Sequence, residues 1–177
     1  LYFRAAEVAA KYGSDPEWVE MLLKKAYEKD PAHADTAKHI EYLLRARKRY
    51  AELADFLRSK LPHVGDPQER AACLLELAYL ELEHTGEPQR AEEHLKEAQR
   101  LSPGFEKTTI LLVEAYTQQE KWEDLIALYE NEYKNGANAE EMCLQLGMLW
   151  WKKVGDLDTA EQYFQKLRKG DNLPPLG

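Results

Sequence analysis

Hydrophobic and polar positions follow a helical period along nearly the whole chain. Apolar residues recur every three or four positions in stretches of helical length, and no stretch shows the alternation of period two that strands require. Proline and glycine interrupt these stretches at intervals, as at residues 13–16, 65–67 and 86–88. In each of these breaks the proline follows an acidic residue, which favours the first turn of a helix. The pattern predicts an all-α protein of short antiparallel helical hairpins.

The hairpins repeat one another in two alternating frames. Residues 143–167 align with residues 74–98, and residues 121–129 align with residues 49–57. The alternation gives a super-period of roughly 70 residues, or two repeats of about 35. The matched pairs are Leu77 with Leu146, Ala78 with Gly147, Gly86 with Gly155, Ala91 with Ala160, Leu95 with Phe164, and Tyr50 with Trp122.

This frame resembles the tetratricopeptide repeats. The family pattern places Leu-Gly or Leu-Ala and an aromatic residue in the first helix of each repeat, then a glycine turn, then alanine, aromatic and alanine positions in the second helix. The resemblance implies a right-handed α-solenoid of stacked antiparallel helix pairs, with about five hairpins. It places repeats at about 1–33, 34–66, 67–103, 104–136 and 137–172, followed by a tail at 173–177.

Several positions depart from the family pattern. Glu81 stands where the aromatic belongs, Glu120 replaces a turn glycine, and Asn172 stands where a closing proline is expected. The first-helix segments of the third and fifth repeats are also one residue longer than the family pattern. The sequence therefore leaves open which side of each of these two helices faces the core.

A hairpin of this kind cannot bury its apolar face alone. Small residues such as Ala78 and Gly147 let helix axes approach, while Leu77 and Phe164 fill the space between layers. Stacking completes the core, so we expect residues 1–177 to form a single repeat domain, cut from a longer chain. Such a domain exposes apolar surface at its ends.

Composition narrows the possible partners. The net charge of −8 opposes binding to nucleic acid or to an anionic membrane, and no apolar run reaches the length of a membrane span. A protein or peptide partner of cationic or mostly apolar character fits better. Cys73 and Cys143 lie within apolar helical patterns and are expected in the core. The compartment stays unsettled, with the cytoplasm slightly favoured.

The sequence offers little catalytic chemistry. The five histidines form no metal-binding spacing with one another or with cysteine, and each glycine stands alone in a turn rather than in a phosphate-binding loop. Paired acids such as Glu92 and Glu93 are expected to be first-turn or solvent-facing charges. We therefore expect no enzyme activity, no metal and no cofactor.

A basic run stands out at residues 45–50. Cations there oppose the negative end of a helix dipole, which accounts for the run without a ligand. The alternative is docking of an acidic peptide or phosphate at Arg45, Arg47, Lys48 and Arg49.

The resemblance to the family implies that ligands lie in a concave groove lined by the first helices. Leu144, Met148 and Trp151 form an apolar strip beside the core stripe that contains Trp150, so Trp151 faces either a ligand or another repeat. The residues that the family frame places in the groove are Tyr42, Arg45, Leu75, Tyr79, Leu82, Glu114, Gln118, Leu144, Met148, Trp151 and Lys152.

The function predicted from this frame is a non-catalytic scaffold that binds a peptide or protein partner in the groove. The alternative is a structural spacer or self-assembly segment that associates through its exposed end repeats. A third reading is the half-repeat relatives of the family found in RNA-processing assemblies, and the net charge opposes direct RNA contact.

Overall fold

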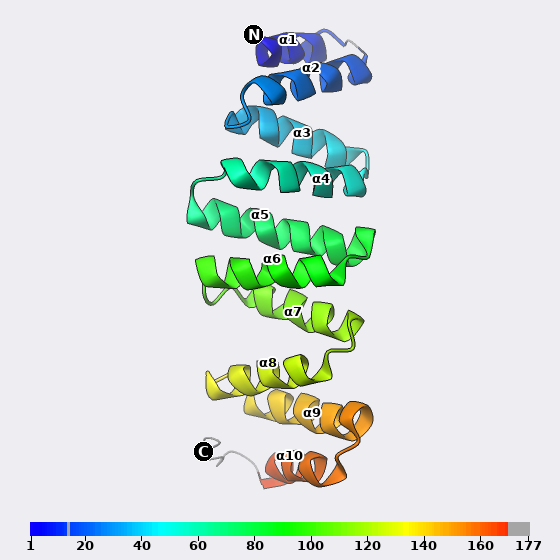
Figure 1. The fold of residues 1–177 in the computed structure, drawn as a ribbon, viewed down its shortest axis with the longest axis vertical. Helices are drawn as coiled ribbons and strands as arrows, with labels where there is room; N and C mark the ends of the chain where they lie inside the picture. Colours follow the sequence, from blue (N-terminus) through cyan, green and yellow to red (C-terminus); the bar gives the residue numbers. More distant parts are fainter. Residues whose placement is uncertain (14, 170–177) are drawn as a thin grey trace. The chain divides into compact units, whose positions relative to one another are not determined.

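The computed structural model describes residues 1–13 and 15–169, and the helices of this part form two compact units. The first unit spans Leu1–Thr108 and the second begins at Thr109. Asn172 and the tail predicted at 173–177 lie outside the described residues. Each unit is described by itself (Figure 1).

The first unit consists of three helix pairs and the start of a seventh helix. Within each pair, the two helices lie side by side (Figure 1). The elements are α1 (Tyr2–Lys11), α2 (Pro16–Lys29), α3 (Ala34–Ala46), α4 (Tyr50–Lys60), a 3₁₀ turn η1 (Leu61–His63), α5 (Pro67–Leu80), a π turn η2 (Glu81–Thr85), α6 (Pro88–Leu101) and α7 (Glu106–Gln118), which continues into the second unit.

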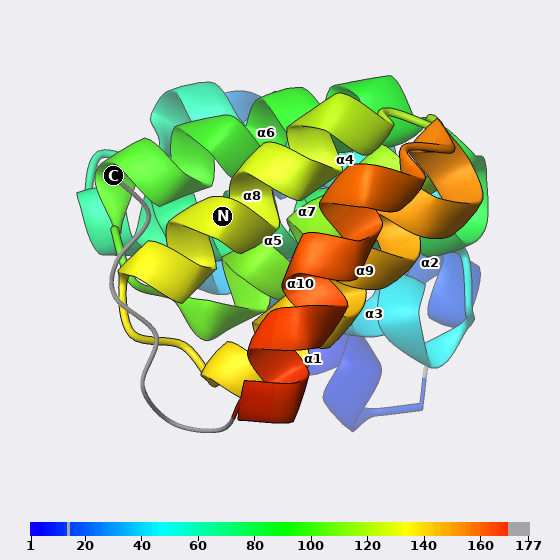
Figure 2. The same cartoon turned by 90° about the horizontal axis from the view of Figure 1, so that it is seen from below.

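The second unit continues with three further α-helices and one further π turn. They are α8 (Trp122–Lys134), α9 (Ala139–Leu149), a π turn η3 (Trp150–Val154) and α10 (Leu157–Lys169). Figure 2, in which the view of Figure 1 is turned by 90°, shows α10 beside α9, with which it packs.

Local sequence signals set the helix starts. Pro16, Pro67 and Pro88 each occupy the first turn of a helix, as predicted. The side chain of Asp66 accepts a hydrogen bond from the Glu69 backbone N–H at 2.8 Å, and that of Asp156 accepts one from the Thr159 N–H at 3.0 Å. These caps satisfy backbone donors that the first turn leaves free.

The extra residue in the third and fifth repeats is absorbed by a π turn. Both turns stand at the end of a first helix, and both are followed by a left-handed glycine, Gly86 and Gly155. A π turn accommodates one residue more than an α-helical turn closed at the same place. The longer segments therefore keep the helix before the turn in register with its neighbours.

The turn glycine that the second frame lacks is replaced by strained residues. Lys48 and Glu120 both have a φ of 55°, at the place where the other turns carry Gly13, Gly86 and Gly155. A side chain in this left-handed region costs about 1–2 kcal/mol, which glycine avoids. The chain thus keeps the turn geometry although the glycine is missing.

Glycine at these two positions should stabilise the protein. We expect Lys48→Gly and Glu120→Gly each to raise the free energy of unfolding by about 0.5–1 kcal/mol, because relief of strain exceeds the entropic cost of glycine. Denaturant unfolding measures the change. The matched control is Gly13→Ala, whose φ of 70° predicts a loss of similar size. A loss of stability in both glycine variants would contradict the assignment of strain.

Candidate binding surfaces on the first helices

In the first unit, an ion pair joins two successive first helices. Nε of Arg45 on α3 donates to Oε1 of Glu76 on α5 at 2.8 Å, and Nη2 of Arg45 also lies 3.2 Å from Oε2 of Glu41. Burial lowers the pKa of Arg45, but the carboxylates of Glu76 and Glu41 raise it by a larger amount. The pKa of Arg45 is therefore raised overall. The guanidinium is held between α3 and α5.

Two exposed tyrosines lie near this ion pair in sequence. Tyr42 lies three residues before Arg45 on α3, and Tyr79 lies three residues after Glu76 on α5. Residues three apart are neighbours on a helix face, so each tyrosine lies about one turn from its own member of the pair. Tyr42 is 70% exposed and Tyr79 is 42% exposed. We call Tyr42, Arg45, Glu76 and Tyr79 the tyrosine surface.

The other two groove positions predicted in this unit do not reach the surface. Leu75 and Leu82 are both buried. Their side chains contribute to the core and offer no area to a ligand, so the candidate site rests on the exposed members.

The π turn of the first unit supports Tyr79 through a histidine. His84 stacks on Tyr50 with ring centroids 3.9 Å apart, and it meets the edge of Tyr79 at 6.0 Å. In the second unit, the equivalent residue Lys153 lies over the ring of Trp122, 4.4 Å from its centroid. Glu76 and His84 were missed by sequence reasoning. The sequence signal for His84 was the match of Tyr50 with Trp122, because the fourth residue of a π turn contacts each of these rings.

In the second unit, the predicted groove residues lie on α7, α9 and η3. Gln118 donates to Glu114 at 3.2 Å within α7. Leu144 and Trp151 are 47% and 49% exposed, Met148 is half-buried, and Nζ of the exposed Lys152 lies 5.3 Å from the Trp151 ring centroid.

The core stripe of α9 is separate from this strip. Cys143, Leu146 and Gly147 are buried, and Trp150 is half-buried. The two adjacent tryptophans therefore have different surroundings. Of the two rings, that of Trp151 lies farther out of the core.

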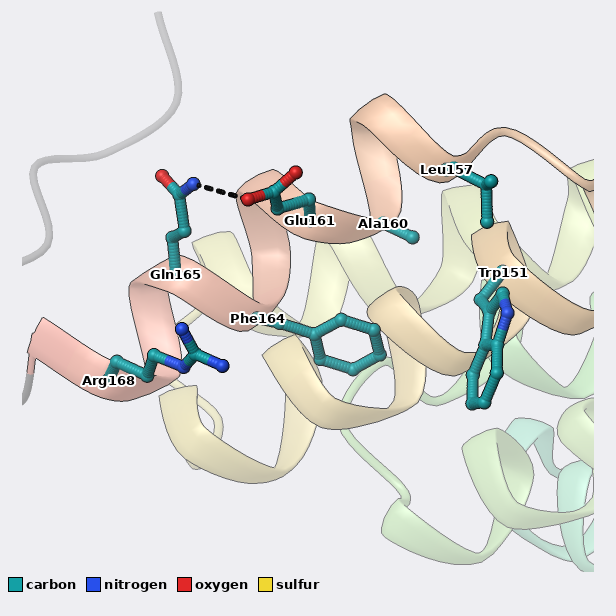
Figure 3. Close-up of a pocket in the computed structure, with 7 residues that line it drawn as sticks. All are labelled: Trp151, Leu157, Ala160, Glu161, Phe164, Gln165 and Arg168. Atoms are coloured by element: carbon teal, nitrogen blue, oxygen red, sulfur yellow. Dashed lines mark hydrogen bonds between the residues drawn. The ribbon is translucent and has the colours of Figure 1, made fainter.

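Trp151 also borders an open cleft on α10 (Figure 3). The cleft has a volume of about 340 Å³. Phe164 stands near its middle, with Trp151 and Leu157 at one end and Arg168 at the other (Figure 3). We call this feature the end cleft; its lining consists of Trp151, Leu157, Ala160, Glu161, Phe164, Gln165 and Arg168.

The arginines of the basic run at residues 45–50 pair with carboxylates of the first unit. Nη1 of Arg47 donates to Oε2 of the buried Glu20 at 2.6 Å, and Nη1 of Arg49 donates to the same oxygen at 2.8 Å. Burial raises the pKa of Glu20, but hydrogen bonds from Lys24 and Arg49 outweigh it and lower the pKa overall. Since the three arginines are paired with carboxylates of the same unit, the structure favours the account without a ligand over an acidic-ligand site.

The remaining reactive groups are structural. Cys73 and Cys143 are free and buried, as predicted, and burial raises the pKa of the Cys73 thiol to about 11. In the described ranges, no group of three or more His, Cys, Asp or Glu side chains could hold a metal ion. Over the same residues, each helix is too short or too polar to cross a membrane.

Comparison with known proteins agrees with this architecture. The family model of the tetratricopeptide repeat matches residues 108–140, which contain all of α8 and most of α7. No curated protein matches the chain in sequence. A crystal structure of the MamA protein has a TM-score of 0.61 at 18% identity, over 98% of this chain and 96% of that chain.

Two other solved structures share the fold. PilF of Pseudomonas aeruginosa has a TM-score of 0.53 at 21% identity, over 95% of this chain and 74% of that chain. The structure of Naa15/Naa10 bound to HypK-THB gives 0.63 at 17% identity, over 99% of this chain and 25% of that chain. At such identities the likeness shows the fold and carries no particular partner.

The stacked hairpins and these relatives define an all-α helical-repeat protein with a solenoid fold, as predicted. The resemblance to the tetratricopeptide-repeat family is confirmed by the family match together with the fold. Repeats of this family are generally non-catalytic modules that bind protein partners.

Proposed function

We propose that this protein is a non-catalytic scaffold that binds a peptide segment of a protein partner on the tyrosine surface of its first unit. The observation that carries the proposal is the pair of exposed tyrosines on α3 and α5, each about one helical turn from a member of the Arg45–Glu76 ion pair. Exposed aromatic side chains of low entropy next to a positioned arginine are typical of recognition surfaces.

The net charge of the chain favours a cationic or apolar peptide. Arg45 pairs with the carboxylates of Glu41 and Glu76, and Glu41 also pairs with Lys60, so the ion-pair cluster at the tyrosine surface is itself neutral. The whole chain carries a net charge of −8. A lysine- or arginine-containing peptide would be attracted, and added salt would weaken that attraction.

A peptide-selection experiment tests the proposal. Peptides are selected from a random display library on the wild-type chain, and their affinities are measured by fluorescence anisotropy. We expect Tyr42→Ala and Tyr79→Ala each to weaken binding about tenfold or more, because each removes a central aromatic contact. Tyr79→Phe should retain most of the affinity, since it keeps the ring.

The control is Tyr12→Ala, which removes a tyrosine that is at least as exposed and that follows the last residue of α1. If neither Tyr42→Ala nor Tyr79→Ala changes the affinity of the selected peptides, the peptides do not bind on the tyrosine surface and the proposal is wrong. A uniform loss in all three tyrosine variants would indicate non-specific aromatic binding instead.

The groove residues predicted in the second unit form a second candidate surface for the same peptide-binding function. An apolar strip with one cation is formed by Leu144, Met148, Trp151 and Lys152, and the preceding first helix α7 carries Glu114 and Gln118.

The second candidate function is self-assembly. It is favoured by the apolar side chains exposed on α1 and at the end cleft.

A further inference from the structure

A small cavity opens in the first unit where α1, α2 and α3 meet. Its volume is about 200 Å³. Small-molecule sites usually measure roughly 300–1,000 Å³, so this cavity has room for a single side chain. We call it the α1–α3 cavity; its lining consists of the buried Ala6, Val19 and Leu23 and the exposed Glu7, Ala10 and His39.

The buried positions of the first helices show which residues correspond from one repeat to the next. Each first helix carries, toward its end, two buried residues three positions apart: Ala6 and Ala9 on α1, Glu41 and Leu44 on α3, and Ala78 and Glu81 on α5 and its π turn. The same alignment of α1 with α3 also pairs the left-handed turn residues at 13 and 48. In this register Ala10 corresponds to Arg45, and His39 corresponds to Glu76.

Between α3 and α5, an arginine of the chain occupies the place of this cavity. Nε of Arg45 on α3 donates to Oε1 of Glu76 on α5 at 2.8 Å. Between α1 and α3, the same two positions hold Ala10 and His39, and the alanine side chain is too short to reach across. The α1–α3 cavity is therefore the space that a guanidinium fills one repeat later.

The lining of the cavity offers acceptors to a positively charged group. Among the described residues, Glu7 has no ion-pair partner. Nδ1 of His39 lies 2.7 Å from the carbonyl oxygen of Asp35, which can only accept, so Nδ1 carries a proton. A neutral imidazole then keeps its other nitrogen, Nε2, as an acceptor. His39 thus offers an acceptor at the position where Glu76 accepts from Arg45.

We infer that the α1–α3 cavity receives a lysine or arginine side chain of the peptide bound on the tyrosine surface. The methylene groups of this side chain lie against the buried apolar lining, and its charged end meets the carboxylate of Glu7. His39 lies three residues before Tyr42 on α3, so the cavity begins about one helical turn from the tyrosine surface. The inference rests on the proposed function and adds the residue type that the peptide carries.

The test uses the peptides selected from the random display library. We expect them to share a lysine or arginine at one position. Its replacement by norleucine, which keeps an unbranched alkyl chain without the charge, should weaken binding to the wild type about fivefold. This ratio of affinities is the charge preference of the protein, and fluorescence anisotropy measures it for each variant.

Two variants of the cavity should remove the charge preference. Ala10→Arg supplies a guanidinium from the protein itself, so it should weaken binding of the basic peptides about tenfold and abolish their advantage over the norleucine peptide. Glu7→Gln keeps the shape of the side chain and removes its charge, so the preference should fall below about twofold. Both positions are exposed, so both variants should fold.

The matched control is Glu28→Gln, which removes the same charge from an exposed position of α2 outside the cavity and should leave the preference unchanged. Peptides that depend on the two tyrosines but share no basic residue, or whose preference survives both cavity variants, overturn the inference and leave the proposed function standing. Peptides that depend on the cavity but not on the tyrosines support the inference and overturn the tyrosine surface as the docking place. A wild-type chain that selects no peptide overturns both.

Discussion

Replacing Glu81 with alanine is expected to lower the free energy of unfolding by about 2–3 kcal/mol. Glu81 is 0% exposed, and its carboxylate accepts from Nε of Arg58 at 3.2 Å and lies 2.8 Å from Nδ1 of His94. The alanine variant leaves both partners facing an apolar space. We place the loss below the usual range for a broken buried pair because Arg58 also pairs with Asp55 and Glu87.

Two further variants define the cause of this loss. Glu81→Gln keeps an acceptor of the same shape, so about half of the stability should return. Glu83→Ala changes an exposed glutamate of the same π turn and should alter stability by less than about 0.5 kcal/mol. Urea unfolding monitored by circular dichroism measures all three. Equal stability of Glu81→Ala and Glu83→Ala would show that the network adds nothing.

The second large effect is expected at Gly147. A Cβ atom there would lie 2.6 Å from Cε1 of Phe164, so Gly147→Ala should destabilise the second unit by about 1–2 kcal/mol. Helix propensity alone predicts the opposite sign, because alanine is favoured over glycine by about 1 kcal/mol inside a helix. Thermal unfolding of Gly147→Ala and of the wild type decides between packing and propensity.

The third repeat supplies the compensating change. Ala78 and Leu95 occupy the places of Gly147 and Phe164, and both are fully buried. The double variant Gly147→Ala with Phe164→Leu should therefore be more stable than Gly147→Ala alone. Gly65→Ala serves as a control, since an added Cβ at Gly65 meets no atom within 4 Å. Additive effects at 147 and 164 would argue against direct contact.

The departures from the family pattern were visible in the sequence, but their meaning was not. Glu81 stands where an aromatic was expected, and only the arrival of Arg58 from α4 and His94 from α6 explains how a carboxylate is buried there. Polar groups from three separate segments meet here, and spacing along one segment does not predict such a meeting.

The sequence also predicted only some of the residues of the candidate site. Tyr42, Arg45 and Tyr79 were predicted for the groove, but Glu76 was missed, because its role depends on the approach of α3 to α5. Leu75 and Leu82 fell in the same predicted stripe and are buried. A helix face has a width set by its neighbours, and the neighbours are known only in three dimensions.

The sequence by itself determined the helical hairpins, their starts at Pro16, Pro67 and Pro88, and the repeat frame that pairs Ala78 with Gly147. These features depend on local backbone preferences and on a period of 3.6 residues, which are written along the chain. The tertiary structure decided that the extra residues form π turns and that the arginines of the basic run pair with Glu20, Glu41, Glu52 and Glu76. It also decided that Trp151, and not Trp150, lines the end cleft. Those outcomes depend on which segments meet across the fold, and contacts between distant segments are set by packing rather than by any local preference.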